Sequence, residues 1–209
     1  MKKFYRNLAK LALRLHNFSY KLATRLAIRA EDGLHPKHRL MNYHKFFVDN
    51  VSPEDTVLDI GCGNGALTFD VAKKAKRIIG IDLSKKNIKI AKEKFSRENI
   101  EYIQGNILKS LPDEKFDVII LSNILEHIPN RIEFLENLKN KAQKFLIREP
   151  MINRDWITLY KKELGVEWRS DPTHFTEYTL EGFKEELEKV NLNLENYSIQ
   201  FGEIWAVVR

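Results

Sequence analysis

VLDIGCGNG at residues 57–65 is the stretch that decides the fold of this chain. An apolar strand, predicted at 56–60, runs into three glycines at alternate positions. A second predicted strand, 77–82, ends in Asp82, which lies 17 residues after Gly65. In an open α/β sheet this arrangement holds an adenosine nucleoside at the carboxyl ends of neighbouring strands. The spacing differs from the dinucleotide pattern G-x-G-x-x-G, and no P-loop lysine follows. The loop therefore favours a nucleoside without phosphates.

The same residues resemble the class I S-adenosylmethionine-dependent methyltransferases, and within them the small-molecule branch that includes the ubiquinone-biosynthesis methyltransferases. The likeness continues through 104–107 and 116–128, and covers roughly residues 55–128. The resemblance implies an α/β fold of Rossmann-like type, with a seven-stranded, mostly parallel sheet, helices on both faces and an antiparallel C-terminal hairpin. It also implies that S-adenosyl-L-methionine is the cofactor and that the chain is a methyltransferase.

The resemblance assigns cofactor-binding roles position by position. Gly61 and Gly63 would let the backbone approach the methionine part of the cofactor, because a Cβ there would collide with it. Asp59 would fix the loop, and Asp82 would accept hydrogen bonds from both ribose hydroxyls. Asn106 stands where the family usually has an acid beside the adenine. The predicted cofactor-binding residues are Asp59, Gly61, Cys62, Gly63, Asp82, Leu83, Asn106, Ile107, Ser122 and Asn123.

Strands and helices alternate from residue 56 onward. We predict further strands at 100–104, 116–121 and 143–148, helices at 65–75, 84–96 and 130–141, and two strands around Phe201-Gly202. Continuous apolar runs such as 118–121 fit strands that are buried on both faces of a parallel sheet. Ser84 is the expected N-cap of the helix at 84–96. We divide the chain into an N-terminal helical extension, 1–50, and a catalytic domain, 51–209.

The extension is basic and amphipathic. The chain has a net charge of +6, and residues 1–29 hold eight Lys and Arg side chains and no acid. A helix is predicted there, with a weakening near His16-Asn17. Its apolar residues recur at helical spacing. They are Phe4, Leu8, Leu11, Leu15, Phe18, Leu22 and Leu26. Three alternatives are open: this stripe docks on the catalytic core, lies on an anionic membrane surface, or belongs to an arm that binds nucleic acid.

Composition narrows the cellular setting. Cys62 is the only cysteine, so no internal disulfide can form, and it is expected to be a small buried residue. No secretory signal is recognisable, and no apolar run approaches the roughly 18 residues that a membrane span needs. We therefore expect a cytoplasmic protein, with peripheral contact at the inner membrane face as an extension of the membrane alternative.

The segment 149–178 breaks the alternation of strands and helices. It is dense in aromatic, acidic and basic side chains, and it follows the fifth strand, where loops cover the carboxyl edge of such a sheet. We expect it to cover the substrate, together with the histidine-rich turn near residues 35–44. The predicted substrate residues are His38, Tyr43, Trp168, Arg169, Asp171 and Tyr178.

Two histidines are candidate general bases. His127 follows the fourth strand, close to where the sulfonium of the cofactor should lie, although it could also be a helix-start residue. His174 lies between Asp171 and Glu177, either of which could orient it. Glu126 and His127 supply only two local ligands, so we predict no metal site.

Several acceptors are compatible with this reading. We favour an oxygen or nitrogen atom of a small polar acceptor, such as a glycan sugar or its lipid-linked precursor. A quinone or phenol at the membrane surface is the second hypothesis. An RNA acceptor is less favoured, because residues 122–125 read Ser-Asn-Ile-Leu and not Asn/Asp-Pro-Pro-aromatic. A non-catalytic nucleoside-binding protein is the fourth. The sequence sets no oligomeric state.

Overall fold

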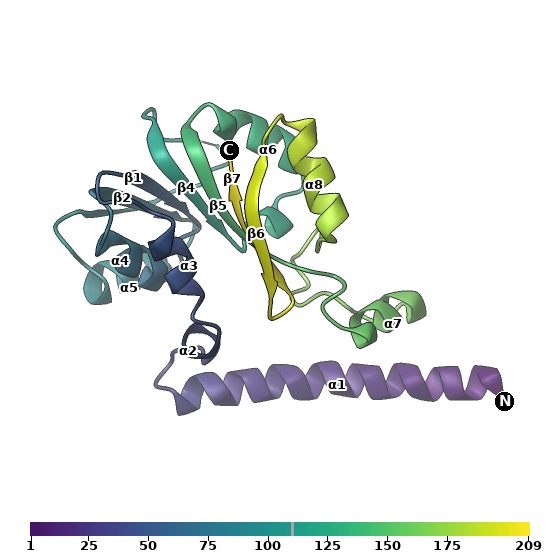
Figure 1. Ribbon diagram of the computed structural model, residues 1–209. Helices are drawn as coiled ribbons and strands as arrows, with labels where there is room; N and C mark the ends of the chain where they lie inside the picture. Colours follow the sequence, from purple (N-terminus) through teal and green to yellow (C-terminus); the bar gives the residue numbers. More distant parts are fainter. Residues whose placement is uncertain (110) are drawn as a thin grey trace.

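The centre of the fold is a seven-stranded sheet with the strand order β3-β2-β1-β4-β5-β7-β6. Figure 1 shows it in a computed structural model, which describes residues 1–109 and 111–209. The strands are β1 (Thr56–Ile60), β2 (Arg77–Asp82), β3 (Ile100–Gln104), β4 (Phe116–Ser122), β5 (Ala142–Pro150), β6 (Leu194–Gln200) and β7 (Glu203–Val208). The first five are parallel, β7 is antiparallel to β5, and β6 is antiparallel to β7. The predicted fold class is confirmed.

Two of the helices, at residues 156–164 and 180–189, lie where no helix was predicted from the sequence. The helices are α1 (Lys2–Ala30), α2 (Lys37–Met41), α3 (Tyr43–Asp49), α4 (Ala66–Ala72), α5 (Lys85–Lys94), α6 (Arg131–Lys139), α7 (Trp156–Leu164) and α8 (Leu180–Lys189), with a short 3₁₀ turn η1 (Leu125–His127). Ser84 caps α5 as predicted, because its side chain accepts a hydrogen bond from the Asn87 N–H at 3.2 Å. The missed helix α7 has clear end signals: Asp155 caps its start, and Gly165 ends it with φ +66°.

Helices cover both faces of the sheet because the central strands are apolar on both faces. Val57 packs with α3 and α4 on one face, whereas the next residue, Leu58, packs with α6 and α8 on the other. In β2, Ile78 packs on the same face as Val57, and Ile79 packs on the same face as Leu58. This alternation follows from the two-residue period of a strand. Because β1 to β5 run parallel, the loops that follow them all lie at one edge of the sheet.

Helix α1 lies apart from the sheet as a single rod (Figure 1). It runs through His16-Asn17 without a break, and it contacts the body through Leu13, which packs with Leu164 and Val166 beside α7. Every residue of the apolar stripe is at least 45% exposed. The alternative in which this stripe docks on the catalytic core is therefore wrong. The reason is that α3, α4, α6 and α8 already cover the two apolar faces of the sheet.

Among the described residues, we find no helix with the length and apolarity that crossing a bilayer requires.

A buried ion pair joins β5 to β7. Arg148 is 2% exposed, and its Nε and Nη2 atoms donate to the two carboxylate oxygens of Glu203 at 2.5 and 2.7 Å. Its Nη1 atom donates to Ser122 Oγ at 3.2 Å, and its guanidinium centre lies 3.8 Å from the centre of the Tyr43 ring. One side chain thus connects β4, β5, β7 and α3.

We expect Arg148→Met to lower the free energy of unfolding by about 3–5 kcal/mol, because it removes the charged partner of the Glu203 carboxylate, which is only 14% exposed and keeps the Trp205 Nε1–H as a donor. Arg148→Met/Glu203→Met should recover most of that loss. Urea unfolding followed by circular dichroism measures both. Arg77→Met, which breaks an exposed pair with Glu101 and Glu114, is the control and should cost less than about 1 kcal/mol. A double variant as unstable as the single one would contradict this account.

Candidate active site

A cavity of about 400 Å³ opens at the carboxyl ends of β1, β2 and β4. Its size is within the range of small-molecule sites, and its position is the switch point at which ligands bind in open α/β sheets. The loops after four strands form its wall. The lining residues are Ile60, Gly61, Ile81, Asp82, Leu83, Ser84, Gly105, Asn106, Ile107, Leu108, Asn123, Ile124, His127 and Ile128.

The glycine loop is shaped by backbone conformation and by close packing. Gly61 has φ +72°, and a Cβ on it would lie 2.1 Å from Cδ1 of Ile124. The sequence analysis expected such a Cβ to collide with the ligand; here the obstacle is a side chain from the loop after β4. Gly63 has φ +56° and open space where its Cβ would be. The loop therefore needs glycine at both positions, because side chains rarely adopt these φ values.

Asp82 ties the glycine loop to the start of α5. Its Oδ2 accepts from the Gly63 N–H at 2.9 Å, and its Oδ1 accepts from the Ser84 N–H at 2.8 Å and from Asn87 Nδ2 at 3.2 Å. A carboxylate offers about four acceptor positions, so one remains for a ligand hydroxyl. This side chain lines the cavity as the sequence analysis expected, but with less spare capacity than two ribose hydroxyls would need.

Six of the ten predicted cofactor-binding residues line the cavity: Gly61, Asp82, Leu83, Asn106, Ile107 and Asn123. Four do not: Asp59, Cys62, Gly63 and Ser122. Cys62 packs with Ala91 and Tyr102, and burial raises the pKa of its thiol. The Ser122 hydroxyl accepts from Arg148, as described above. The apolar residues Leu108, Ile124 and Ile128 were missed, although each lies within four residues of a predicted position.

Asn106 turns the loop after β3. Its Oδ1 accepts from the Leu108 N–H at 3.0 Å, and its carbonyl accepts from the Lys109 N–H at 2.9 Å. The amide oxygen that was expected to bind the adenine amino group therefore already has one donor, and its second lone pair remains.

Asp59 is buried beneath the glycine loop. Its side chain accepts from the Thr68 hydroxyl at 2.6 Å. Burial raises the pKa of Asp59 to about 7; the bond from Thr68 opposes this shift, and the nearby Asp82 carboxylate adds to it. It acts on the cavity through the loop above it, because it does not itself line the wall.

The loop after β4 is held from below by Glu149, at the end of β5. The Glu149 carboxyl is fully buried and accepts from the N–H groups of Ile124, Leu125 and Glu126 at 3.3, 3.0 and 3.3 Å. Burial, followed by repulsion from the Glu126 carboxylate, raises the pKa of Glu149 well above its usual range. The loop enters this turn at Asn123, whose φ is +57°.

Two buried oxygens in this loop lack a hydrogen-bond partner within the described part of the chain. They are Oδ1 of Asn123 and Oε2 of Glu126. The other polar atoms of these groups are paired, since Asn123 Nδ2 donates to Glu126 Oε1 at 2.9 Å. Buried polar atoms are usually satisfied. Asn123 lines the cavity, so its unpaired oxygen indicates a ligand with polar hydrogens or positive charge, whereas Glu126 is fully buried behind the wall.

His127 and His174, which are separated by 47 residues of sequence, meet beside this loop. Their ring centres are 4.7 Å apart in an edge-to-face arrangement. His127 lines the cavity, and its Nδ1 lies 3.1 Å from the Thr173 hydroxyl. His174 is buried, with Nδ1 3.1 Å from Glu177 Oε1 and Nε2 3.9 Å from Glu126 Oε1. The two predicted bases therefore belong to one cluster.

Glu177 anchors that cluster. Its carboxylate accepts from the Ser170 N–H at 2.5 Å, from the Ser170 hydroxyl at 2.9 Å, and from Arg154. Burial by itself would raise the pKa of Glu177, but the hydrogen bonds from His174, Ser170 and Arg154 outweigh it and lower that pKa. Glu177 is therefore an ionised partner for the His174 ring.

The same cluster has the composition of a metal site. Glu126, His127 and His174 each offer a ligand atom, and these atoms lie within 4.8 Å of one another. The sequence analysis counted two ligands in this stretch and predicted no metal. The structure adds His174 as a third, and two imidazoles with one carboxylate suit a transition metal.

The predicted substrate residues fall into separate places. Trp168 and Arg169 line a second cavity, of about 190 Å³, between α1 and the segment 149–178. The Tyr43 hydroxyl lies 2.8 Å from His38 Nδ1, and the Tyr43 ring packs against the Arg148 guanidinium. Neither His38 nor Tyr43 lines either of these two cavities. Burial, followed by repulsion from His44, lowers the pKa of His38 to about 4.

Two of the predicted substrate residues have structural partners instead. Asp171 is exposed and accepts from the Thr173 hydroxyl at 2.7 Å, and the same hydroxyl lies 3.1 Å from His127 Nδ1. Tyr178 is buried and donates to Glu186 at 2.6 Å. Its ring packs with Phe183 in the core, away from the lining of both cavities.

A family model described as a methyltransferase domain matches residues 52–202. Ubiquinone biosynthesis O-methyltransferase of Rickettsia conorii is 28% identical over 142 residues, which are 65% of this chain and 49% of that protein. Ribosomal protein L11 methyltransferase of Staphylococcus saprophyticus is 38% identical over 102 residues, 46% of this chain and 32% of that protein. This chain thus spans a third to a half of the length of these two curated relatives.

Solved structures share the fold at low sequence identity. A methyltransferase of Clostridium acetobutylicum has a TM-score of 0.65 at 15% identity, covering 91% of this chain and 98% of that one. The N-methyltransferase NodS of Bradyrhizobium japonicum, solved with S-adenosyl-L-homocysteine, has a TM-score of 0.60 at 15% identity, covering 83% of this chain and 86% of that one.

Asp59 gives a test by pH. Because burial raises the pKa of Asp59 to about 7 in the folded chain, above the ordinary value near 4 of an unfolded aspartate, the stability it contributes is present below pH 4 and is lost as pH rises towards 7. Asp59→Asn should therefore match the unchanged chain near pH 4 and exceed its free energy of unfolding by about 2–4 kcal/mol near pH 7.5.

Urea unfolding at several pH values measures this difference, with Asp49→Asn on the exposed side of α3 as the control. A difference between the Asp59 variant and the unchanged chain that stays constant with pH would show that Asp59 titrates normally.

Proposed function

This chain belongs to the methyltransferase domain family, and we propose that it transfers a methyl group to an oxygen or nitrogen atom of a polar acceptor at the cavity beside His127. It is an S-adenosylmethionine-dependent methyltransferase. One observation carries the proposal about the site: the loop after β4 brings the unpaired oxygen of Asn123 and the ring of His127 to the same cavity that Asp82 lines.

The residues of the cavity fit S-adenosylmethionine. Asp82 has one acceptor position left for a ribose hydroxyl, and Leu83 and Ile107 offer apolar walls for a planar base. The buried Oδ1 atom of Asn123 has no hydrogen-bond partner among the described residues, so a hydrogen-bond donor or a cationic group of the cofactor would satisfy it. When bound, the cofactor supplies an activated methyl group on a sulfonium leaving group. The chain itself then has to orient the acceptor and remove its proton.

We assign proton removal to His127. It lines the cavity, and Thr173 holds its Nδ1, so Nε2 is the ring atom left for the acceptor. His174 is a positioning residue, because it is buried, bonded to Glu177 and packed edge-on against His127. The backbone supports the same arrangement: the Phe175 N–H donates to the Glu126 carbonyl at 2.7 Å, which links the segment 149–178 to η1.

The favoured acceptor remains a small polar molecule, such as a sugar or a lipid-linked precursor. The second cavity supports it through four basic side chains in its lining, Lys21, Arg154, Lys161 and Arg169. Arg154 pairs with Glu177 and Arg169 with Glu167, so the positive charge available to an acceptor comes mainly from Lys21 and Lys161. An anionic acceptor group would fit there. A quinone or other phenol is the second candidate, favoured by the relatives named as ubiquinone biosynthesis O-methyltransferases.

Asp82→Asn tests the cofactor site. A charged hydrogen bond contributes about 1.5–3 kcal/mol, so the dissociation constant of S-adenosylhomocysteine should rise by roughly 10- to 100-fold. Isothermal titration calorimetry measures it, with Asp49→Asn as the matched control. The variant should also lose any preference for adenosine over 2′,3′-dideoxyadenosine. If the unchanged chain binds these two nucleosides equally, Asp82 does not hold the ribose.

His127→Ala tests the base. Turnover should fall by about 10²- to 10⁴-fold, with the acceptor KM little changed, and added imidazole should restore part of kcat. His174→Gln should reduce kcat less and should not respond to imidazole. Transfer of radiolabelled methyl groups to a panel of phenols, amino sugars and lipid extracts provides the assay, and His44→Gln is the control.

A metal role for the cluster predicts a different result. If a chelator abolishes turnover of the unchanged chain and zinc or manganese restores it, while imidazole fails to rescue His127→Ala, the assignment of His127 as base is wrong.

A further inference from the structure

The apolar stripe of α1 is uncovered along its whole length. It consists of Phe4, Leu8, Leu11, Leu15, Phe18, Leu22 and Leu26, and these side chains are 45–65% exposed. Scattered exposed apolar residues are common, but a continuous row of seven large ones on one helix marks a binding surface. The helix of 29 residues is about 43 Å long, so the stripe is long and narrow.

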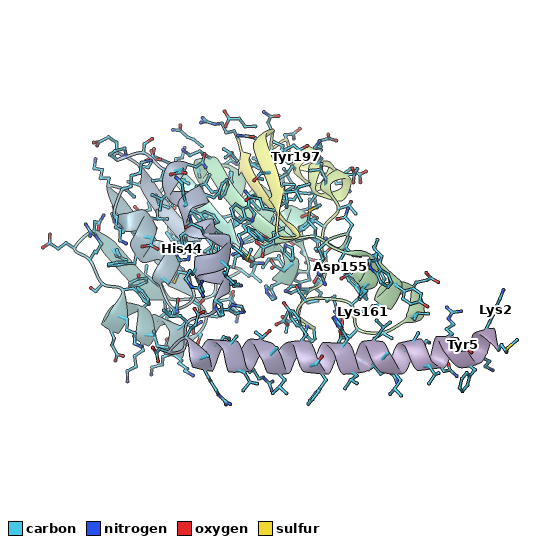
Figure 2. All side chains as sticks on the ribbon, turned by 60° about the horizontal axis from the view of Figure 1, so that its bottom comes forward. Lys2, Tyr5, His44, Asp155, Lys161 and Tyr197 are labelled. Carbon is cyan, nitrogen blue, oxygen red and sulfur yellow. The ribbon has the colours of Figure 1, made fainter. Side chains whose placement is uncertain are left out.

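The stripe points away from the body. Leu13, which holds α1 against α7, is two residues from both Leu11 and Leu15, and therefore lies about 200° around the helix from each. The bonds to the body come from the same side as Leu13: Asn17 donates to the Glu167 carbonyl at 2.7 Å, and His16 lies 3.2 Å from Lys161. Figure 2 shows Lys161 on the body side of α1, with other side chains projecting from the opposite side.

Charge identifies what can cover this surface. The first 29 residues carry eight basic side chains and no acid. A second copy of α1 packed on the stripe would bring eight more positive charges alongside, which opposes pairing. RNA would use the positive charge but would leave the apolar stripe in water. An anionic lipid surface satisfies both, because acyl chains accept the stripe and headgroups accept Lys and Arg.

We propose that α1 lies in the surface of an anionic membrane, with its apolar stripe towards the acyl chains and its basic residues among the headgroups. Exposed basic residues such as Lys3, Arg14 and Arg25 follow one side of the stripe, as this orientation requires. The body is attached to the opposite side of the helix, so the catalytic domain stays in water.

This orientation sets which part of the body faces the membrane. Helix α7, on which α1 rests, follows the carboxyl end of β5. The second cavity lies directly between α1 and the segment 149–178. The side of the body that carries α7 and this cavity therefore faces the membrane, with α1 between them.

Vesicle flotation with the full chain tests the docking. The chain should bind phosphatidylcholine vesicles that contain phosphatidylglycerol, and bind pure phosphatidylcholine vesicles much more weakly. Leu11→Gln/Leu15→Gln should weaken binding by about tenfold or more, because two buried side chains are lost from the interface. Lys3→Gln/Arg14→Gln/Arg25→Gln should also weaken it and reduce its dependence on salt.

Ala12→Gln/Ala23→Gln is the matched control, because both residues are exposed on α1 outside the stripe. This variant should bind vesicles as the unchanged chain does. Binding of S-adenosylhomocysteine checks the fold of each variant. It also separates the two proposals: its loss in the unchanged chain would refute the cofactor site, whereas vesicle binding reports only on α1.

Three results would overturn the docking proposal. The first is equal vesicle binding by Leu11→Gln/Leu15→Gln. The second is that the unchanged chain does not bind vesicles but forms a dimer in light scattering, and that Leu11→Gln/Leu15→Gln abolishes this dimer. The third is tight, salt-sensitive RNA binding without vesicle binding.

Discussion

The carboxyl group of Glu149 is the constraint on which the active site depends. It accepts three successive backbone N–H groups from residues 124–126, and it does so without exposure to water. Three buried amide groups without acceptors would cost several kcal/mol, so the loop after β4 has to turn over this carboxyl. The turn requires a left-handed backbone at Asn123, and it carries Asn123 and His127 to the cavity. Cofactor contact and proposed proton transfer therefore share one anchor.

The neighbouring residue braces the other face of the sheet. Because side chains alternate along a strand, Arg148 points away from Glu149 and connects β5 to Glu203, Ser122 and Tyr43. The end of β5 thus sets the loop that carries the candidate base and, on the opposite face, the position of α3. Arg148 and Glu149, which are consecutive in the sequence, can therefore both be buried, because ionisable side chains are stable in the interior only when they are paired or hydrogen-bonded.

The glycine-loop side of the candidate site was predictable from the sequence, and the side formed by His127 and His174 was not. Gly61 and Asp82 belong to one strand–loop–strand unit, so their separation in sequence limits their separation in space, and both line the cavity. The catalytic cluster joins the loop after β4 to a segment some 47 residues later, and nothing local in the sequence specifies that contact. His174 was identified as a candidate, but not its meeting with His127. Glu149 was read as part of a substrate loop, because a charged residue at a strand end usually indicates exposure.

The sequence by itself indicated the alternating strands and helices of the nucleoside-binding half, a loop suited to a nucleoside without phosphates, and the amphipathic nature of residues 1–29. These follow from local spacing, because glycine conformation, strand alternation and helical periodicity are properties of short stretches. Tertiary structure decided which side of α1 touches the body, and which residues stand behind the cavity wall. Both depend on contacts between residues far apart in the chain. A helical period shows that a face is apolar, but only the packing of Leu13 against α7 shows that this face is left open.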